Sequence, residues 1–397
     1  MNKIEVRDLT KIFGKHPKQG VRLLKEGKSK DEILKETGMT VGVNRVSFDV
    51  EAGEVFVIMG LSGSGKSTLI RLVNRLIEPS NGTILIDGED ISKMDKNQLM
   101  ETRRKKLGMV FQNFGLFPHR TIQENTGYGL EVQKKDKTEI ATKSRQALEL
   151  VGLQGYEDQY PDQLSGGMQQ RVGLARALAN DPDILLMDEA FSALDPLIRK
   201  GMQDELLDLQ QKMQKTILFI THDLDEALKI GDRIALMKDG VIVQIGTPED
   251  IMTNPADDYV EKFVENVDRS KVFTASHVMI RPETIQLGKA GPRVALQRMK
   301  QAGISSVYVT KNNNELYGIV TAEAAAEAIK NGVKDLEEIV DKNVPTVAPE
   351  VALIDLFDKI HDAPIPMAVT EDGILKGIIV RGAVLAALSR NEVKSHE

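Results

Sequence analysis

Residues 55–67 read Val-Phe-Val-Ile-Met-Gly-Leu-Ser-Gly-Ser-Gly-Lys-Ser, an apolar run followed by a glycine-rich turn. The apolar run is typical of a buried strand, and the residues after the turn predict a helix over Thr68–Ile77. Glycines let successive backbone N–H groups of such a turn point inward, and the helix N-terminus adds partial positive charge. The pattern Gly60-x-x-x-x-Gly65-Lys66-Ser67 between a strand and a helix therefore predicts a loop that holds the phosphates of a nucleotide.

The chemistry of phosphate binding assigns roles within this loop. Lys66 offers a mobile cation to the β- and γ-phosphates of ATP, and the Ser67 hydroxyl is a hard oxygen ligand for Mg²⁺. The predicted ATP-binding residues of the loop are Gly60, Leu61, Ser62, Gly63, Ser64, Gly65, Lys66, Ser67 and Thr68.

Two acids end a second buried-type strand, Ile184–Asp188. Asp188 stands at the carboxyl end of this strand, where open α/β sheets bind their ligands, and it can hold Mg²⁺ through water. Glu189 follows it, where a carboxylate can orient and deprotonate an attacking water. Alone, the two acids could mark a solvated turn; with a phosphate loop upstream, they favour nucleotide hydrolysis.

A second glycine-rich turn, Leu164-Ser165-Gly166-Gly167-Met168, leads into a helix predicted over Val172–Ala179. Such a turn at a helix N-terminus can bind an anion, although this one has no lysine. One chain does not need two phosphate cradles for one nucleotide. The second cradle makes sense if it closes over a nucleotide that another subunit holds.

With this third motif, residues 1–265 resemble an ATP-binding cassette (ABC) ATPase, for which the Leu164–Gly167 pattern is the most specific signal. The resemblance implies that Phe13 stacks on adenine, that Gln112 touches Mg²⁺, and that His222 contacts the γ-phosphate. Catalysis is expected from Lys66, Glu189 and His222, and Mg²⁺ binding from Ser67, Gln112 and Asp188. The same resemblance implies that Ser165, Gly166, Gly167 and Met168 bind ATP of the other subunit, and that Ser192 and Asp195 communicate across the dimer.

A narrower resemblance rests on an insertion at about residues 15–41 and on the segments Asn74–Pro79 and Met187–Leu197. These are similar to the ATPase subunit of bacterial glycine betaine/proline-type osmoprotectant importers. Within the insertion, Ser29 and Glu32 have the spacing of a capping box, and Gly38 is expected to end that helix.

The residues after about 270 carry a weak internal repeat, after a polar boundary around Val264–Ser270. Tyr308–Val320 and Ala368–Val380 each predict two strands joined by a polar turn, and each precedes an alanine-rich helix. A recurring unit of this size indicates a duplicated domain. The importer resemblance implies tandem cystathionine-β-synthase (CBS) domains at 271–330 and 334–392. The resemblance implies that such a pair binds an adenine-containing ligand, such as an adenine nucleotide or a cyclic dinucleotide, or responds to ionic conditions, and that it regulates transport. The alternative is a dimerising clamp without a ligand. Two prolines in Ala363–Pro366 depart from the pattern, so the copy that would hold a ligand stays open.

The composition and the net charge exclude several other classes of protein. With 397 residues, 41% of them hydrophobic and 28% charged, the chain can bury an ordinary core. A net charge of −7 argues against a protein that mainly binds nucleic acid. No apolar run approaches the roughly 20 residues of a membrane span, and Met1–Glu5 lacks the pattern of a secretion signal. The absence of cysteine excludes disulfides, thiolate zinc sites and cysteine nucleophiles.

The expected fold is α/β: an ABC-type P-loop ATPase domain followed by a duplicated small α/β domain, the CBS pair. The expected function is ATP hydrolysis by a homodimer at the cytoplasmic face of the cell membrane. It would power uptake of glycine betaine or a related compatible solute through separate permease subunits, with an extracellular solute-binding protein or domain as an indirect partner and no nucleic acid. The stretch Gln112–Tyr128 matches the family's docking region for the permease.

Three other readings stay open. An importer ATPase for an amino acid or a polyamine would share every motif, because this subunit never touches the solute. A non-transport ABC protein would usually carry a second cassette or a long coiled coil. A nucleotide-sensing regulator with a vestigial cassette would not need the intact Lys66, Asp188, Glu189 and His222.

Overall fold

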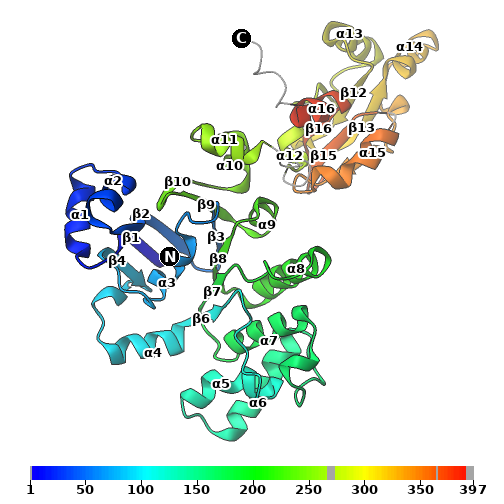
Figure 1. Ribbon diagram of the computed structural model, residues 1–397. Helices are drawn as coiled ribbons and strands as arrows, with labels where there is room; N and C mark the ends of the chain where they lie inside the picture. Colours follow the sequence, from blue (N-terminus) through cyan, green and yellow to red (C-terminus); the bar gives the residue numbers. More distant parts are fainter. Residues whose placement is uncertain (1, 266–272, 364, 390–397) are drawn as a thin grey trace. The chain divides into compact units, whose positions relative to one another are not determined.

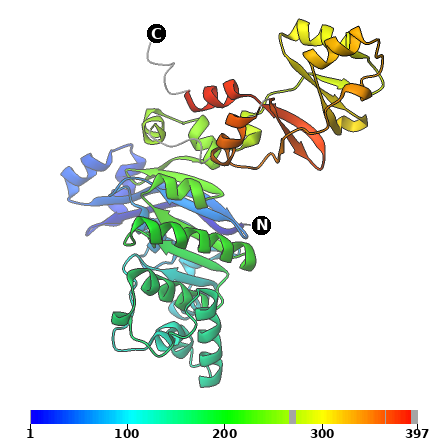
Figure 2. The same cartoon turned by 90° about the vertical axis from the view of Figure 1, so that its right-hand side faces the viewer.

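The computed structural model describes residues 2–265, 273–363 and 365–389, and it divides into two compact units, Met1–Val264 and Glu265–Glu397 (Figures 1 and 2). The predicted boundary around Val264–Ser270 and the end of the predicted 334–392 repeat fall largely on residues outside these ranges. Among the described residues, no helix combines the length and the apolar content that crossing a membrane requires.

A six-stranded sheet with the order β10-β9-β3-β8-β7-β6 forms the centre of the first unit. Its strands are β3 (Val55–Met59), β6 (Leu107–Val110), β7 (Ile184–Asp188), β8 (Thr216–Thr221), β9 (Arg233–Lys238) and β10 (Val241–Gly246). All neighbours pair in parallel except β10, which runs antiparallel to β9. Every residue of β3, β7 and β8 is buried, which explains their uninterrupted apolar sequences. The carboxyl ends of these three strands therefore meet at one edge.

A second, antiparallel sheet has the order β2-β1-β4-β5. It contains β1 (Asn2–Phe13), β2 (Thr40–Glu51), β4 (Asn81–Ile86) and β5 (Glu89–Asp90). Its buried face shares one core with β3 and with α3 (Lys66–Val73), through residues such as Ile4, Phe48, Phe56 and Leu69. This packing holds the phosphate loop between the two sheets.

The helix predicted over Thr68–Ile77 was misplaced at both ends. It begins at Lys66, directly after the flanking residue Gly65, and it ends at Val73. Arg75 has a positive φ of 49°, a left-handed conformation that cannot continue an α-helix.

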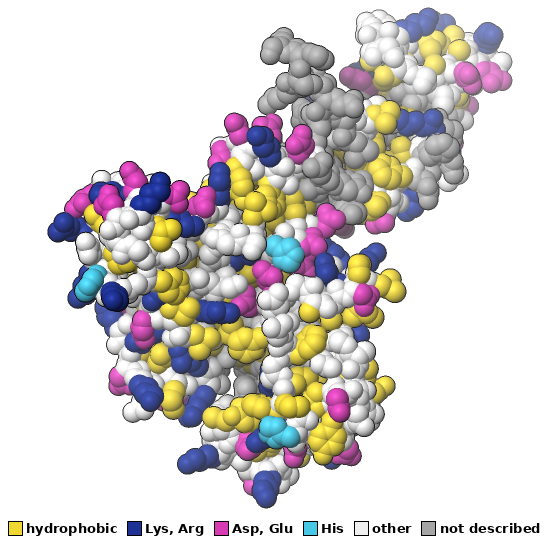
Figure 3. Space-filling model, in the orientation of Figure 1, with side chains coloured by type: hydrophobic (Ala, Val, Ile, Leu, Met, Phe, Trp, Pro, Cys, Tyr) yellow, Lys and Arg dark blue, Asp and Glu magenta, His cyan; other side chains and the backbone are white. Residues whose placement is uncertain are grey.

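The insertion folds as two short helices, α1 (Pro17–Lys25) and α2 (Lys30–Thr37), over a small core that includes Ile12, Leu23 and Ile33. The predicted capping box of Ser29 and Glu32 is confirmed, and Gly38 ends α2 with φ 67°. Figure 3 shows basic and acidic side chains intermixed over these helices, and ion pairs join Arg22 to Glu26 and Lys28 to Glu36.

Among the remaining helices of the first unit, α5 (Ile122–Val132) and α6 (Lys137–Leu150) pack against α7 (Gly166–Leu178), which contacts β6. In Figures 1 and 2, α5, α6 and α7 gather at one end of the unit. The helix predicted over Val172–Ala179 is the C-terminal part of α7, which starts earlier, at Gly166. The bounds are α4 (Lys96–Lys106), α5 (Ile122–Val132), α6 (Lys137–Leu150), α7 (Gly166–Leu178), α8 (Pro196–Met213), α9 (Leu224–Ile230), α10 (Pro248–Thr253) and α11 (Asp258–Val264), with short 3-10 turns at Ile91–Lys93 and Pro161–Gln163.

The second unit contains two three-stranded sheets with the same topology, β11-β12-β13 and β14-β15-β16. In each sheet the first two strands pair in parallel and the last two antiparallel. The strands are β11 (Thr284–Gln286), β12 (Ser306–Thr310), β13 (Leu316–Thr321), β14 (Thr346–Val347), β15 (Met367–Glu371) and β16 (Ile374–Ile379). The helices are α12 (Ala275–Val278), α13 (Pro292–Ala302), α14 (Ala322–Lys330), α15 (Phe357–Asp362) and α16 (Arg381–Ser389).

Tyr308 joins the two sheets of this unit. Its ring is buried in a cluster with Ile319, Ala368 and Leu375, and its hydroxyl donates a hydrogen bond to the carbonyl oxygen of Pro366. Burial raises the pKa of Tyr308, so the hydroxyl keeps its proton and remains a donor.

We expect Tyr308→Phe to lower the free energy of unfolding of the second unit by about 1 kcal/mol, because the partly buried carbonyl of Pro366 loses its donor. Hydrogen exchange of the β12 and β15 amides in the full chain would measure this. Tyr317→Phe is the matched control, because the Tyr317 hydroxyl bonds an exposed partner, Glu337, and its loss should change exchange little. Unchanged exchange in Tyr308→Phe would contradict the expectation.

Candidate functional site

The phosphate loop can be built only with glycine at two positions. Gly60 and Gly65 have φ values of 154° and 106°. A Cβ atom on Gly60 would stand 2.1 Å from the carbonyl oxygen of Met237, and one on Gly65 would stand 2.4 Å from that of Gly42. The loop is therefore packed tightly against β9 and β2, and a side chain at either glycine would collide with their backbone.

Lys66 is buried at the start of α3, with only 4% of its side chain exposed. Its Nζ donates to the carbonyl oxygens of Gly60 at 2.8 Å and Leu61 at 3.1 Å, and it lies 4.0 Å from Oε1 of Glu189. Burial lowers the pKa of Lys66, while the charges of Glu189 and Asp188 act in the opposite direction. The arrangement keeps a poorly hydrated cation beside the phosphate cradle.

Ser67 and Asp188 bring two oxygen ligands together. The Ser67 Oγ donates to Oδ1 of Asp188 at 3.0 Å, and Nη2 of Arg71 lies 3.9 Å from Oδ2. Burial raises the pKa of Asp188, and the Ser67 hydroxyl and the Arg71 charge oppose this rise. A hydroxyl and a carboxylate side by side are hard ligands, so their chemistry fits Mg²⁺.

Glu189 is the point where three loops converge. Its Oε2 accepts from Nε2 of Gln112 at 3.3 Å and lies 3.3 Å from Nδ1 of His222. Its backbone carbonyl accepts from the Ser192 hydroxyl at 2.9 Å, and its own φ is 47°, in the left-handed region. Gln112 also donates Nε2 to the Ser192 Oγ at 3.1 Å, so its amide oxygen is not used in these bonds and is available to a metal.

Phe13 presents an aromatic face near this loop. The residue is 40% exposed, and Lys11 Nζ lies 5.2 Å from the centroid of its ring. A Cβ on Gly42 would stand 2.8 Å from the Phe13 ring and 3.5 Å from Cγ2 of Thr68, so the ring and the loop border the same glycine. An exposed ring in this place is suited to stack on a base.

The turn at Ser165–Met168 stands apart from these residues. The Ser165 hydroxyl accepts from the Met168 N–H at 3.4 Å and caps α7, while the Asp195 carboxylate caps α8 by accepting from the N–H groups of Leu197 and Ile198. Within the described part of the chain, no hydrogen bond or ion pair links Ser165–Met168 to Lys66 or Glu189. The structure thus joins Lys66, Ser67, Gln112, Asp188, Glu189, Ser192 and His222 in one network and leaves the second cradle outside it.

Sequence reasoning missed three charged residues next to this network: Arg71, Arg199 and Asp223. Arg71 lies in α3 and faces Asp188, and Arg199 pairs with Asp223 at 3.3 Å. Asp223 directly follows His222 and caps α9, a position that its residue type could have indicated. Arg199 lies in the first turn of α8, and no local pattern announces its partners.

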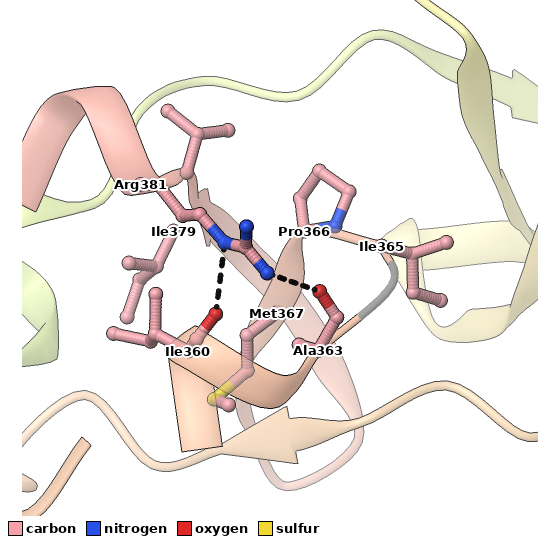
Figure 4. Close-up of a pocket in the computed structure, with 8 residues that line it drawn as sticks. Ile360, Ala363, Ile365, Pro366, Met367, Ile379 and Arg381 are labelled. Carbon is pink, nitrogen blue, oxygen red and sulfur yellow. Dashed lines mark hydrogen bonds between the residues drawn. The ribbon is translucent and has the colours of Figure 1, made fainter. Parts of the chain in front are cut away.

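The second unit contains a cavity of about 330 Å³ next to β15 and β16 (Figure 4). It is lined by Ile360, Ala363, Ile365, Pro366, Met367, Ile379, Val380 and Arg381. Arg381 donates to the carbonyl oxygens of Ile360 at 3.2 Å and Ala363 at 3.3 Å, as the dashed lines show. An apolar wall with one cation, at the lower end of the volumes that bind small molecules, suits an organic anion.

Comparison with known proteins gives two family matches. Residues 43–192 match the model described as ABC transporter, and residues 275–331 match the CBS domain. The chain is 64% identical to the glycine betaine/carnitine transport ATP-binding protein GbuA of Listeria monocytogenes, over 99% of both proteins. It is 62% identical to the glycine betaine transport ATP-binding protein OpuAA of Bacillus subtilis, over 98% of this chain and 93% of that protein.

Among solved structures, the chain is similar to a dimeric post-hydrolysis state of the ATP-binding cassette MJ0796 bound to ADP and Pi. The identity is 30% and the TM-score 0.53, over 62% of this chain and 98% of that one. Together with the family matches, this similarity confirms the predicted fold class of an ABC ATPase fold with a C-terminal CBS domain.

Proposed function

This chain belongs to the ATP-binding subunits of glycine betaine ABC importers, and on that basis we propose which of its residues bind and hydrolyse ATP and which partners receive the work. The observation that carries the proposal is the convergence of Lys66, Asp188, Glu189 and His222 from the loops after β3, β7 and β8. A nucleotide bound at this edge would meet a cation, two carboxylates and an imidazole at once.

The nucleotide would bind with its base on Phe13 and its phosphates in the loop Gly60–Thr68. The backbone N–H groups of the loop and the Lys66 ammonium would hold the negative charge of the phosphates. Ser67, Asp188 and Gln112 would hold Mg²⁺, which neutralises charge on the β- and γ-phosphates when it is bound.

Hydrolysis would use the residues at the carboxyl end of β7. Glu189 orients a water and takes its proton as the water attacks the γ-phosphorus, a contribution of about 10²–10⁴-fold to the rate for a general base. Lys66 and the loop N–H groups stabilise the charge that develops on the γ-phosphoryl oxygens. His222, whose ring faces Glu189, contacts the γ-phosphate and keeps the closed geometry.

A second copy of the chain would complete each site. ABC importer ATPase subunits dimerise, and the second cradle, Ser165–Met168, lies outside the Lys66 network of its own chain. We place it over the nucleotide of the partner subunit, where the capped start of α7 supplies N–H groups and partial positive charge. Ser192 and Asp195, on the loop between β7 and α8, would report the state of one site to the other.

Closure of the proposed ATPase dimer would drive a conformational change in separate permease subunits. ABC importer ATPase subunits pair with such membrane proteins, and we place the contact at Gln112–Tyr128, because Gln112 bonds Glu189 at one end of this stretch. The chain would thus lie at the cytoplasmic face of the cell membrane, and an extracellular solute-binding protein or domain would act on it only through the permease.

The solute is a glycine betaine-type compatible solute. The most similar relatives carry names of glycine betaine or glycine betaine/carnitine transport, and a relative from Escherichia coli, 48% identical over 99% of both proteins, is the glycine betaine/proline betaine transport system ATP-binding protein ProV. These names favour quaternary ammonium solutes over an amino acid or a polyamine.

The C-terminal unit would regulate transport as a CBS pair, with repeats at 271–330 and 334–392. The two sheets of equal topology support two copies. The cavity beside Arg381 supports an adenine nucleotide or a cyclic dinucleotide as the ligand of the second copy, because an organic anion needs both an apolar wall and a cation.

Uptake of labelled glycine betaine at high external salt tests the assignment. In a host that lacks this chain, we expect the wild-type chain to restore uptake and the Glu189→Gln chain to leave it at the background level. Background uptake with both chains would remove the osmoprotectant assignment, whereas restored uptake with both would remove the role of Glu189. Labelled carnitine and proline betaine in parallel would rank the solutes.

A further inference from the structure

Arg199 connects two loops of the catalytic edge that are not neighbours in sequence. The first is the loop between β7 and α8, which follows Glu189. Arg199 Nη2 donates to the backbone carbonyl oxygens of Ser192 at 3.4 Å and Leu194 at 3.1 Å. Ser192 in turn bonds the Glu189 carbonyl and the Gln112 side chain. One arm of the guanidinium is thus attached to the backbone that carries Glu189.

The other arm reaches the loop between β8 and α9, which carries His222. Arg199 Nη1 donates to Oδ2 of Asp223 at 3.3 Å. Asp223 is fixed on both sides, because its N–H donates to the Thr221 hydroxyl at 2.9 Å and its Oδ1 accepts from the Glu226 N–H at 3.2 Å. The residue between Thr221 and Asp223 is His222, whose ring position depends on this short, pinned segment.

These contacts lie in a partly buried region of the protein. Only 25% of the Arg199 side chain and 34% of the Asp223 side chain are exposed. The Nε of Arg199 is buried and has no hydrogen-bond partner among the described residues, so the guanidinium is held through its two terminal nitrogens. The planar guanidinium donates hydrogen bonds through two nitrogen atoms at once, which fixes its orientation. A lysine has a single ammonium group and cannot make the same pair of bonds.

We propose that Arg199 is a positioning residue for ATP hydrolysis, which holds the Glu189 loop and the His222 loop in register while it touches neither nucleotide nor water itself. The proposal rests on the proposed roles of Glu189 and His222. The hydrogen bonds of the guanidinium go to Ser192, Leu194 and Asp223 rather than to the Glu189 carboxylate or the His222 imidazole, so its effect on the reaction would come through geometry. Small misplacements of reacting groups reduce rates by up to about 10²-fold.

The test is the kinetics of the purified full-length chain with Mg-ATP. Arg199→Ala should lower kcat by about 10- to 100-fold and leave the dissociation constant of ATP within about 2-fold, because Arg199 makes no contact with the phosphate loop. Asp223→Asn keeps the cap on Glu226 through its side-chain oxygen but removes the charge that faces Arg199, and should also lower kcat. Arg199→Lys should fall between wild type and alanine.

The double variant Arg199→Ala/Asp223→Asn should be no slower than the slower single variant, because both substitutions remove the same connection between the two loops. Losses that multiply would overturn the proposal. The matched control is Asp204→Asn, which removes the 2.7 Å ion pair with Lys229 between the same helices, α8 and α9, away from both loops. It should keep the wild-type kcat; an equal loss in Asp204→Asn would assign the effect to helix packing and overturn the proposal.

Glu189→Gln, measured alongside, separates this inference from the function it rests on. Normal hydrolysis in Glu189→Gln would remove the proposed catalytic role of Glu189, whatever Arg199 does. An inactive Glu189→Gln together with a wild-type kcat in Arg199→Ala would overturn the Arg199 inference alone.

Discussion

Glu189→Gln should reduce the steady-state rate of ATP hydrolysis by about 10²–10⁴-fold, the range that a general base contributes. Glutamine has the size of glutamate and keeps a side-chain oxygen that can accept from Gln112 and from His222, now at 3.3 Å each. It cannot take a proton from water. We therefore expect the fold, ATP binding and ATP-dependent association of two chains to remain. With the full chain, phosphate release would measure hydrolysis, nucleotide titration would measure ATP binding, light scattering would measure association, and circular dichroism would check the fold.

The adjacent carboxylate gives the sharpest comparison for this prediction. Asp188→Asn should weaken Mg²⁺-dependent ATP binding as well as hydrolysis, because Asp188 bonds Ser67 and faces Arg71 rather than the attacking water. Glu101→Gln, which alters an exposed ion pair with Lys105 on α4, should change neither property. A wild-type rate in Glu189→Gln would show that another group activates the water.

Lys66→Ala should abolish ATP binding at concentrations that saturate the wild-type chain, with a loss of affinity of about 100-fold or more. The ammonium is buried and stands 4.0 Å from Glu189, so its removal leaves the Glu189 carboxylate without this cation beside the triphosphate. A charged group that loses its buried partner typically costs about 3–5 kcal/mol, which is more than 10²-fold in affinity. Fluorescence titration with a labelled ATP analogue would measure it.

Arg71→Ala is the control for this second prediction. Arg71 is a cation 3.9 Å from Asp188, but half of its side chain is exposed and it makes no bond to the phosphate loop. Its removal should change ATP affinity by less than about 5-fold, since exposed ion pairs contribute about 0–1 kcal/mol. Equal losses in the two variants would mean that net positive charge, and not the position of Lys66, decides binding.

Local sequence patterns predicted the parts of the fold whose causes are local. The buried strands β3 and β7 are continuous apolar runs because a parallel sheet is covered on both faces, and the capping box of Ser29 is complete within four residues. The phosphate loop could also be predicted from the sequence, because the backbone conformation and the close contacts at Gly60 and Gly65 require glycine.

Other features depend on tertiary contacts that no local sequence pattern indicates. The strand β1 extends over Asn2–Phe13, because pairing with both β2 and β4 includes residues of weak strand preference such as Asp8 and Lys11. The start of α7 was placed too late, because Gly166 and Gly167 are poor helix formers and only the cap at Ser165 sets them in a first turn. Arg199 has partners on two loops, which only the tertiary fold brings to it.

The separation of Ser165–Met168 from the Lys66 network has a genetic consequence. In the proposed dimer, each composite site takes its phosphate loop from one gene product and its capping turn from the other. A cell with one allele damaged at Lys66 and another damaged at Ser165 would assemble mixed dimers in which both lesions meet in a single site, while the other site is built wholly from intact parts. Intragenic complementation between these two classes of allele, and none within either class, is the inheritance pattern that a split site imposes.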